Sequence, residues 1–356
     1  MAAAVALATG LIACGGNEEP AGGGGQGGGG KTEGTVTFLL PENVVARWEG
    51  QDAPFFKEAL RKHAPGLKVQ VQNALNDQSK QQSQAETAAA RGTKVLIVTA
   101  VDQKGAARIV TTAKQQDVPV VAYDRLILDS PVAAYVSVDG VKIGEIQGKW
   151  LADNTERGDK LAIINGSPTD DNAHLFRKGY MRVLDPLFKS REREKVADEW
   201  TRGWEPDRAQ REMEQILTRT NNDVQGVLSA NDGMAAAAIS ALRAQRLAGE
   251  VPITGLDGTP QALNLILRGQ QGMSAYRSLR EQADKAAQIV AALAAGEPVP
   301  QKVTEGNSKN NGATDVPWAQ VKPQVIDKEN VEVVIEDGAA DEAEVCKGVD
   351  AGVGPC

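Results

Sequence analysis

Short apolar runs alternate with helix-length segments along most of the chain, and this alternation constrains the fold more than any other feature. The runs are rich in Val, Ile and Leu, which is typical of strands buried on both faces of a parallel sheet. We expect strands at 36–40, 67–72, 94–99, 118–122 and 134–138, and again at 160–164, 195–199, 224–228, 253–256 and 272–276. We expect helices at 53–63, 79–91, 105–116, 141–153, 173–188, 206–218, 234–245, 261–268 and 279–294. Strands alternating with helices in this way predict two successive βαβ series on parallel sheets.

The strand predicted at 118–122 leads into two adjacent charged residues, Asp124 and Arg125. In open parallel α/β sheets, ligands bind outside the carboxyl ends of the strands. A carboxylate accepts and a guanidinium donates hydrogen bonds in pairs, so together they suit a small, neutral, polyhydroxylated ligand. Taken alone, the two residues fit a surface ion pair equally well. The residues at the ends of the other strands therefore decide between a ligand site and an ion pair.

Polar side chains and two tryptophans come after the other predicted strands as well. A single Asp after a strand is usually a helix N-cap, and we interpret Asp170, Asp232 and His174 as caps, turn residues or surface residues. The recurrence of polar residues at one end of the strands, in both series, instead favours a shared ligand site. The residues assigned to that site are Arg47, Trp48, Asp124, Arg125, Asp171, Asn172, Trp204, Asn231, Asp257 and Arg277.

Catalytic and metal chemistry find little support in the sequence. There is no G-x-S-x-G motif and no Cys near a His, and the two histidines lie far apart. Three arginines in the same site would repel a cation. PENVVARW comes after the first strand where a dinucleotide site needs G-x-G-x-x-G. We therefore expect no catalytic residue, metal or cofactor, and reversible binding of a sugar whose C–H faces lie against tryptophan rings.

Composition limits the partners. The chain has 356 residues, enough for two domains of ordinary size, with 41% hydrophobic and 24% charged residues, as in soluble globular proteins. The formal net charge is −8, whereas a general nucleic-acid binder would show a basic stripe. We therefore expect no nucleic-acid partner.

The first 34 residues resemble an export signal followed by a tether. Residues 2–13 form an apolar run of signal-peptide length, too short to span a membrane as a mature helix. Leu11-Ile12-Ala13-Cys14 resembles a bacterial lipobox, whose Cys takes the lipid, although the usual positively charged residues before the run are absent. The alternative is an ordinary secretory signal with an incidental Cys. Residues 15–34 are rich in Gly, and we expect a flexible tether with a root-mean-square span of roughly 25 Å.

Six stretches in the same order carry a resemblance to a known family. They are ARW at 46–48, VAYDRLI at 121–127, GSPTDDNAHLFRKG at 166–179, EWTRGW at 199–204, SANDGMA at 229–235 and GLDG at 255–258. Over residues 35–340 the chain resembles the type I periplasmic sugar-binding proteins of ABC importers, in particular the members that bind D-xylose. Two positions depart from the xylose pattern, which has Lys where Arg277 stands and Asn where Asp171 stands.

The resemblance implies a fold and a division of the site. It implies two Rossmann-like lobes joined by a hinge of three crossings, near 139, 277 and 303. The first lobe would comprise 35–139 plus 278–302, and the second 140–277 plus 303–340. Arg47, Asp124 and Arg125 would bind the sugar from the first lobe, and Asn172, Trp204 and Asn231 from the second. Asp257 and Arg277 would lie near the hinge, and Trp48 would stack on the ring face opposite Trp204.

The resemblance also implies partners and a location. We expect a monomer that binds a monosaccharide, D-xylose first, and docks on an ABC permease with its ATPase. It would be exported and held on the outer face of the cytoplasmic membrane by its lipid alone. The alternatives are a receptor for glucose, galactose or ribose, and a chemotaxis sugar sensor. A sugar-responsive transcription regulator would need a helix-turn-helix where residues 1–34 stand, and an α/β enzyme would need the nucleophile or phosphate loop sought above.

The last segment, residues 341–356, is acidic and predicted to be a loop outside the core. It holds Cys346 and Cys356, which form the remaining pair if Cys14 carries a lipid. In an exported protein such a pair is expected to be oxidised, so we predict a disulfide between them. The alternative is two free surface thiols.

Overall fold

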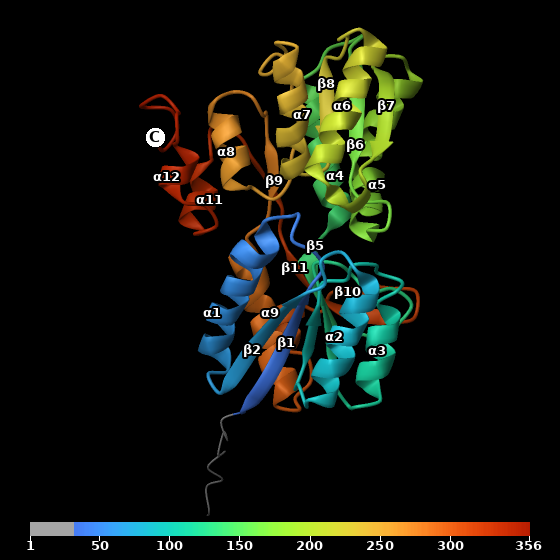
Figure 1. Cartoon of the computed structure of the whole chain (residues 1–356), viewed down its shortest axis with the longest axis vertical. Helices are drawn as coiled ribbons and strands as arrows, with labels where there is room; N and C mark the ends of the chain where they lie inside the picture. Colours follow the sequence, from blue (N-terminus) through green and yellow to red (C-terminus); the bar gives the residue numbers. More distant parts are fainter. Residues whose placement is uncertain (1–31) are drawn as a thin grey trace, which may run out of the picture. The chain divides into compact units, whose positions relative to one another are not determined.

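The computed structural model describes residues 32–356, so Cys14, the lipobox and all of the tether up to residue 31 lie outside it. The described residues form a doubly wound α/β structure with two lobes (Figure 1). Among these residues, no helix is long and apolar enough to cross a membrane.

The first lobe is built on a seven-stranded sheet in the order β10-β11-β5-β4-β3-β1-β2. All neighbouring pairs are parallel except β10 with β11. The strands are β1 (Gly34–Leu40), β2 (Leu67–Asn73), β3 (Leu96–Val98), β4 (Val120–Tyr123), β5 (Ala134–Val138), β10 (Ser308–Asn310) and β11 (Asp315–Val321). The helices are α1 (Ala53–His63), α2 (Gln78–Ala90), α3 (Ala107–Lys114), α9 (Leu279–Ala294) and the short α10 (Gln301–Thr304).

Alternation along the strands of the first lobe produces two hydrophobic layers. Phe38 belongs to the cluster that contains α1 and α9 residues, whereas its neighbour Leu39 belongs to the cluster that contains α2 and α3 residues. Both side chains are fully buried. Successive side chains of a strand point to opposite faces, so an uninterrupted apolar run fills both layers.

The second lobe has a parallel sheet in the order β7-β6-β8, with helices around it. Its strands are β6 (Lys160–Asn165), β7 (Glu194–Trp200) and β8 (Gly226–Ser229), and a second, antiparallel pair is formed by β9 (Ser274–Tyr276) and β12 (Gln324–Ile326). Its helices are α4 (Gly140–Asp153), α5 (Asp171–Lys189), α6 (Pro206–Thr220), α7 (Asp232–Ala244) and α8 (Pro260–Leu267). The strand expected at 253–256 is reduced to two single bridges, Ile253 with Val227 and Leu256 with Ala275.

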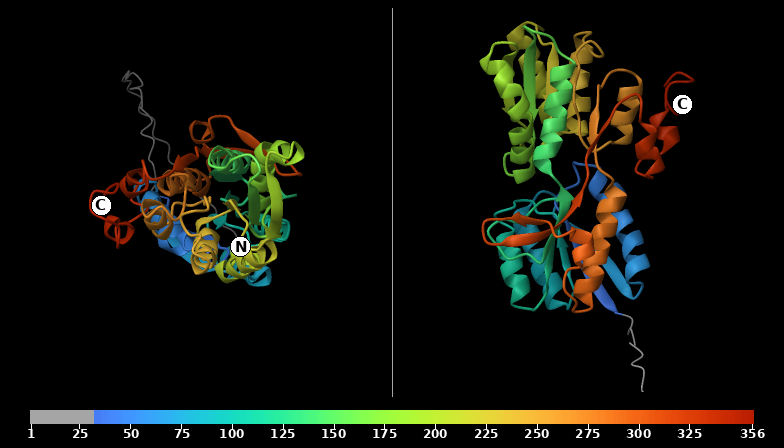
Figure 2. Two further views of the ribbon diagram at one scale, coloured as in Figure 1. Left: turned by 90° about the horizontal axis from the view of Figure 1, so that it is seen from above. Right: turned by 180° about the vertical axis from the view of Figure 1, so that it is seen from behind.

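The predicted second lobe was wrong in one part. Residues 303–321 do not join it, because β11 pairs in parallel with β5 of the first lobe and Trp318 stacks on Tyr135. The third crossing therefore falls between β11 and β12, at 322–323, and not near 303 (Figure 2). The sequence did not predict β11, because it contains Pro317 and a Pro inside an apolar run usually argues against a central strand.

The tail also differs from the loop that was expected. Two short helices, α11 (Glu332–Glu336) and α12 (Glu342–Val345), place Val334 and Val345 in a fourth hydrophobic cluster with residues of α8. Both valines are fully buried. Cys346 and Cys356 form a disulfide.

Two glycines allow α4 and α5 to touch at the backbone. A Cβ on Gly144 would lie 1.9 Å from the carbonyl oxygen of Phe176, and one on Gly179 would lie 2.1 Å from that of Val141. Backbone atoms cannot move aside as the end of a side chain can, so these helices tolerate no larger residue at either position.

We predict that Gly144→Ala or Gly179→Ala lowers the free energy of unfolding by at least about 1–3 kcal/mol, the usual cost of overpacking. Urea denaturation measures the change. Gly50→Ala is the matched control, because a Cβ there meets no atom within 4 Å. Equal stability of all three variants would contradict the close packing of α4 on α5.

Candidate ligand-binding site

A pocket lies where the two lobes meet. Its cavity volume of about 30 Å3 is far below the roughly 300–1,000 Å3 common for small-molecule sites, so the side chains around it must move to admit a ligand. The lining contains nine of the ten residues assigned to the site from the sequence: Arg47, Trp48, Asp124, Arg125, Asn172, Trp204, Asn231, Asp257 and Arg277. Val45, Asp170, Phe176 and Leu256 complete it.

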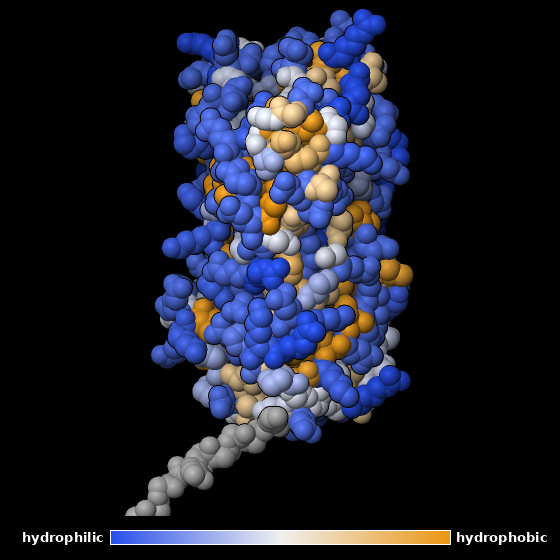
Figure 3. Space-filling model, turned by 90° about the vertical axis from the view of Figure 1, so that its left-hand side faces the viewer, coloured by the Kyte–Doolittle hydropathy of each residue, from blue (hydrophilic) through white to orange (hydrophobic). Residues whose placement is uncertain are grey.

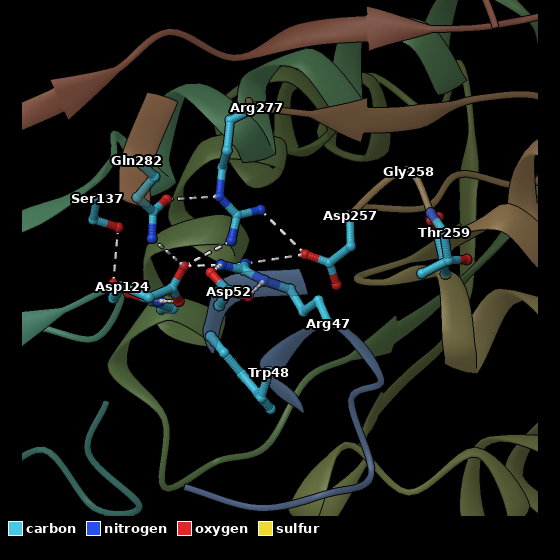
Figure 4. Close-up of polar contacts among 12 residues, drawn as sticks. Arg47, Trp48, Asp52, Asp124, Ser137, Asp257, Gly258, Thr259, Arg277 and Gln282 are labelled. Atoms are coloured by element: carbon cyan, nitrogen blue, oxygen red, sulfur yellow. Dashed lines mark hydrogen bonds and ion pairs between the residues drawn. The ribbon is translucent and has the colours of Figure 1, made fainter. Parts of the chain in front are cut away.

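Two arginines and two aspartates form a closed ring of alternating charge at one side of the pocket (Figure 4). Arg277 donates to Oδ2 of Asp124 at 2.7 Å and to Oδ1 of Asp257 at 3.1 Å. Arg47 reaches the same two oxygens with one nitrogen, at 3.1 and 3.5 Å. Burial raises the pKa of Asp257 well above its usual range, and Arg47 opposes that rise.

Asp52 fixes the direction of Arg47 from behind the pocket. Its two oxygens accept from Nε and Nη2 of Arg47, each at 2.7 Å, and one of them also accepts from the hydroxyl of Tyr123 at 2.7 Å. Burial would lower the pKa of Arg47, but Asp52, Asp124 and Asp257 outweigh it and raise that pKa. Arg47 therefore remains charged and presents its third nitrogen to the ring.

The turn after β4 places Asp124 and Arg125 in the pocket. Asp124 has a φ of 62°, a left-handed conformation that Asp tolerates better than most residues. Its carbonyl oxygen accepts from the hydroxyls of Tyr135 and Ser137 at 3.0 and 2.8 Å, which holds the turn. A strained backbone conformation fixed by its surroundings in this way is common at ligand sites.

Arg125 and Asp170 connect the lobes across the pocket. Nε of Arg125 lies 2.8 Å from Oδ2 of Asp170, and both side chains are buried. The same carboxylate oxygen accepts from the indole nitrogen of Trp204 at 3.1 Å. Asn172, close to Asp170 in the chain, donates to the carbonyl and the carboxylate of Asp124, both at 3.2 Å.

Trp48 and Trp204 line the pocket from opposite lobes. Trp48 lies in the π-helical turn η1 (Trp48–Asp52), donates to Glu42 and has the guanidinium of Arg47 4.4 Å from its ring centroid. Trp204 ends the short 3₁₀ turn η2 (Arg202–Trp204) and packs directly over Gly166, where a Cβ would lie 2.0 Å from the ring. Gly166 is therefore required for this position of the Trp204 ring.

Asn231 and Asp232, at the start of α7, make different contacts. The side-chain oxygen of Asn231 caps the helix by accepting from the N–H of Met234 at 3.0 Å, while the residue also lines the pocket. Asp232 lies outside the pocket lining, but its interpretation as a cap, turn or surface residue was wrong, because Asn231 is the cap of α7 and Asp232 is a buried residue within the helix. It accepts from Ser274 at 2.8 Å and from the N–H of Thr259 at 2.9 Å, so it supports the loop that carries Asp257.

The assignment of Asp171 differs from the structure. Asp171 is half-buried and does not line the pocket, and its N–H donates to Gln103. The neighbouring Asp170 lines the pocket instead, although its place in the sequence predicts only a cap. It is also a cap, because its Oδ1 accepts from the N–H of Asn172 at 3.0 Å, while Oδ2 faces the pocket. His174 is exposed and bonds the carbonyl of Pro168.

Three other polar residues were missed by sequence reasoning: Glu42, Asp52 and Gln282. Gln282 is fully buried, accepts from Nε of Arg277 at 3.4 Å and donates to Asp124 at 3.5 Å. All three act on residues of the pocket and not on its interior. Asp52 and Gln282 lie within helical segments away from strand ends, so the rule used to find the site carries no signal for them. Glu42 comes two residues after β1, where the rule does apply, but its place in the turn did not distinguish it from a turn residue.

The chemistry of the pocket is balanced in charge. Three arginines and three aspartates line it, together with two asparagines and two tryptophans. Opposite charges in equal number suit an uncharged ligand rich in hydroxyl groups, and the tryptophans supply apolar ring faces. In the described residues, no group of three or more His, Cys, Asp or Glu side chains could hold a metal ion.

The fold and the pocket define a class of two-lobed receptors that bind a small polar ligand between their lobes. The chain belongs to the periplasmic binding protein domain family, whose model matches residues 36–298. It is 37% identical to the D-xylose-binding periplasmic protein of Escherichia coli, over 84% of this chain and 88% of the relative. It is 38% identical to the protein of the same name from Haemophilus influenzae, over 82% and 86%.

Solved structures agree with this membership. A carbohydrate transporter solute-binding protein from Chloroflexus aurantiacus, in complex with D-glucose, superposes with a TM-score of 0.79. The two chains are 28% identical, and the match covers 87% of this chain and 97% of that one.

Burial raises the pKa of Asp232 to about 6, although Thr259, Ser274 and Gln271 oppose it. A carboxyl whose pKa is raised by folding adds stability below its unfolded pKa of about 3.9 and loses it as the pH rises through the folded value. The loss over this window amounts to roughly 3 kcal/mol.

We predict that Asp232→Asn removes this pH dependence. The melting temperature of the wild type minus that of the variant should be more positive at pH 4.5 than at pH 7.5. Asp117→Asn, at an exposed aspartate, is the control and should follow the wild type at both values. Parallel curves for the wild type and Asp232→Asn would show that Asp232 does not titrate in this range.

Proposed function

We propose that the protein is the sugar-binding component of an ABC importer and that its ligand is D-xylose. The observation that carries this proposal is the charge-balanced, two-tryptophan pocket between the lobes of a chain 37–38% identical to two D-xylose-binding proteins. The pocket residues are the proposed sugar ligands, with Asp170 in place of Asp171. The protein binds the sugar reversibly and does not transform it.

Closure of the lobes is the proposed signal to the permease. Residues from both lobes line the pocket, so a sugar held there stabilises the arrangement in which the lobes meet. A micromolar ligand contributes about 8 kcal/mol of binding free energy, enough to shift a modest equilibrium between open and closed forms. The permease and its ATPase would recognise the closed form.

D-glucose is the second candidate. The Chloroflexus structure that superposes on this chain holds D-glucose. In addition, this chain has Arg277 where the D-xylose pattern has Lys. The planar guanidinium of Arg277 bonds two carboxylates through two different nitrogens, an arrangement that the single nitrogen of a Lys cannot reproduce. The choice between pentose and hexose therefore needs a direct measurement.

A thermal-shift screen against D-xylose, D-glucose, D-galactose and D-ribose tests the proposal. At a free sugar concentration about 100 times Kd, binding adds about 2.7 kcal/mol to stability and raises Tm by several degrees. We expect the largest rise with D-xylose. A larger rise with D-glucose would keep the class and change the ligand, and no rise with any sugar would overturn the proposal.

We predict that Asp124→Ala and Trp204→Ala each abolish the sugar-induced rise while the sugar-free protein remains folded. Asp124 links both arginines of the charge ring, and Trp204 supplies one ring face. Asp153→Ala and Trp200→Ala are matched controls outside the pocket and should retain the full rise. Unchanged sugar affinity in both pocket variants, measured by calorimetry, would contradict the site.

The anchor remains a separate proposal, because Cys14 lies outside the described residues. If Cys14 carries the lipid, the protein expressed in a bacterial host should partition into the detergent phase. Cys14→Ser should move it to the aqueous phase without changing sugar binding. An unchanged partition would favour the ordinary secretory signal.

A further inference from the structure

The C-terminal segment, residues 327–356, is attached firmly to the second lobe. Val334 and Val345 are fully buried against Leu263 and Ile266 of α8. Asn264 of α8 donates to the carbonyl oxygens of Val345 and Lys347, at 2.7 and 2.9 Å. Figure 1 shows α11 and α12 beside α8, on the side of the molecule where α1 lies.

The disulfide closes the chain directly beyond this attachment. Cys346 lies between the two residues whose carbonyls Asn264 holds, and Cys356 packs against the same hydrophobic cluster. A Cβ on Gly354 would lie 2.8 Å from Leu267 of α8, so the returning chain also lies close to the lobe. The face of the molecule on this side is mostly hydrophilic, with an apolar patch in its upper half (Figure 3).

The same segment contacts the first lobe at the start of α9, near the second crossing. Asp337 accepts from Ser278 at 2.9 Å with its side chain and from Nε of Arg280 at 2.9 Å with its carbonyl. It also accepts from the hydroxyl of Tyr276 in β9. The guanidinium of Arg280 lies 4.3 Å from the ring centroid of Phe55 in α1, and Phe55 packs against the cluster of the segment.

A further contact lies at the cleft. Gln51 of η1 donates from its side chain to the carbonyl oxygen of Ala339. Gln51 precedes Asp52, which fixes Arg47, and lies in the same turn η1 as Trp48 of the pocket. This hydrogen bond therefore joins the pocket-lining turn of the first lobe to a segment that is anchored on the second lobe.

We propose that residues 327–356 form an interlobe strap that stabilises the closed form and slows release of the sugar. The strap is anchored on α8 and pinned at the crossing by Asp337, and it meets η1 when the lobes are together. Its contact with Gln51 is lost when η1 moves away from the second lobe, so the contact favours closure. The effect on sugar affinity rests on the proposed function, whereas the effect on closure does not.

The hydrogen bond between Gln51 and Ala339 determines how large a change in sugar dissociation we expect. Loss of one hydrogen bond to an uncharged group corresponds to a roughly two- to tenfold change in an equilibrium constant. Gln51→Ala should therefore raise the dissociation rate of the sugar about two- to tenfold and leave the association rate nearly unchanged. Cys346→Ser/Cys356→Ser, which loosens the end of the strap, should act in the same direction.

The test uses the full chain and two measurements. Stopped-flow fluorescence gives the sugar's association and dissociation rates, and small-angle scattering gives the radius of gyration with and without sugar. Lys57→Ala, at an exposed residue of α1, is the matched control for Gln51→Ala and should behave as the wild type. Gln51→Glu separates the contact from loss of volume, because a carboxylate cannot donate to the carbonyl of Ala339.

The outcomes separate the strap from the proposed function. Faster dissociation and a larger average radius in Gln51→Ala, Gln51→Glu and the cysteine variant, but not in Lys57→Ala, would support the strap. Rates and radius equal to those of the wild type in all three would overturn it, even if the wild type binds D-xylose tightly. If no sugar binds the wild type, the proposed function fails and the radius alone decides the strap: a rise in the three variants supports it, and no change overturns it.

Discussion

The shared coordination of two carboxylate oxygens by two arginines is the interaction on which the site depends. Oδ2 of Asp124 and Oδ1 of Asp257 each accept from both Arg47 and Arg277, inside a pocket where all four residues are buried. Removing one partner from such a buried pair typically costs about 3–5 kcal/mol, because it leaves a charge without compensation. Asp124 comes from the first lobe and Asp257 from the second, so the same contacts that organise the pocket also hold the lobes together.

Most of the fold is predictable from the sequence because its strands are buried on both faces. Such strands appear as continuous apolar runs, and nearly all of the predicted strands and helices occur within a few residues of their expected positions. β11 could not be found in this way, since Pro317 weakens its pattern and its partner β5 lies about 180 residues earlier in the chain. Nothing local in a sequence indicates which sheet a late strand joins.

The grouping of the candidate site residues around one pocket was predictable for a similar reason. Side chains at the carboxyl ends of parallel strands must meet at one edge, so Asp124, Arg125 and Asp257 could be placed together without a structure. The sequence could not show whether Asp170 or Asp171 lines the pocket. Asp170 does so because only one of its oxygens caps α5, which leaves the other to bond Arg125 in the pocket. Asp52 was missed because its role is to hold Arg47, and a residue that acts through another has no positional signal of its own.

The return of the chain to the first sheet affects the order in which the protein can fold. The strands β6, β7 and β8 lie within residues 160–229, so their sheet can form from one continuous stretch of chain. The outer edge of β5, in contrast, stays unpaired until residues 315–321 have been made. An open edge of buried apolar residues is a template for pairing with another chain, and contacts this distant in sequence form slowly. The first lobe is thus the part of the molecule most exposed to misassembly before the chain is complete.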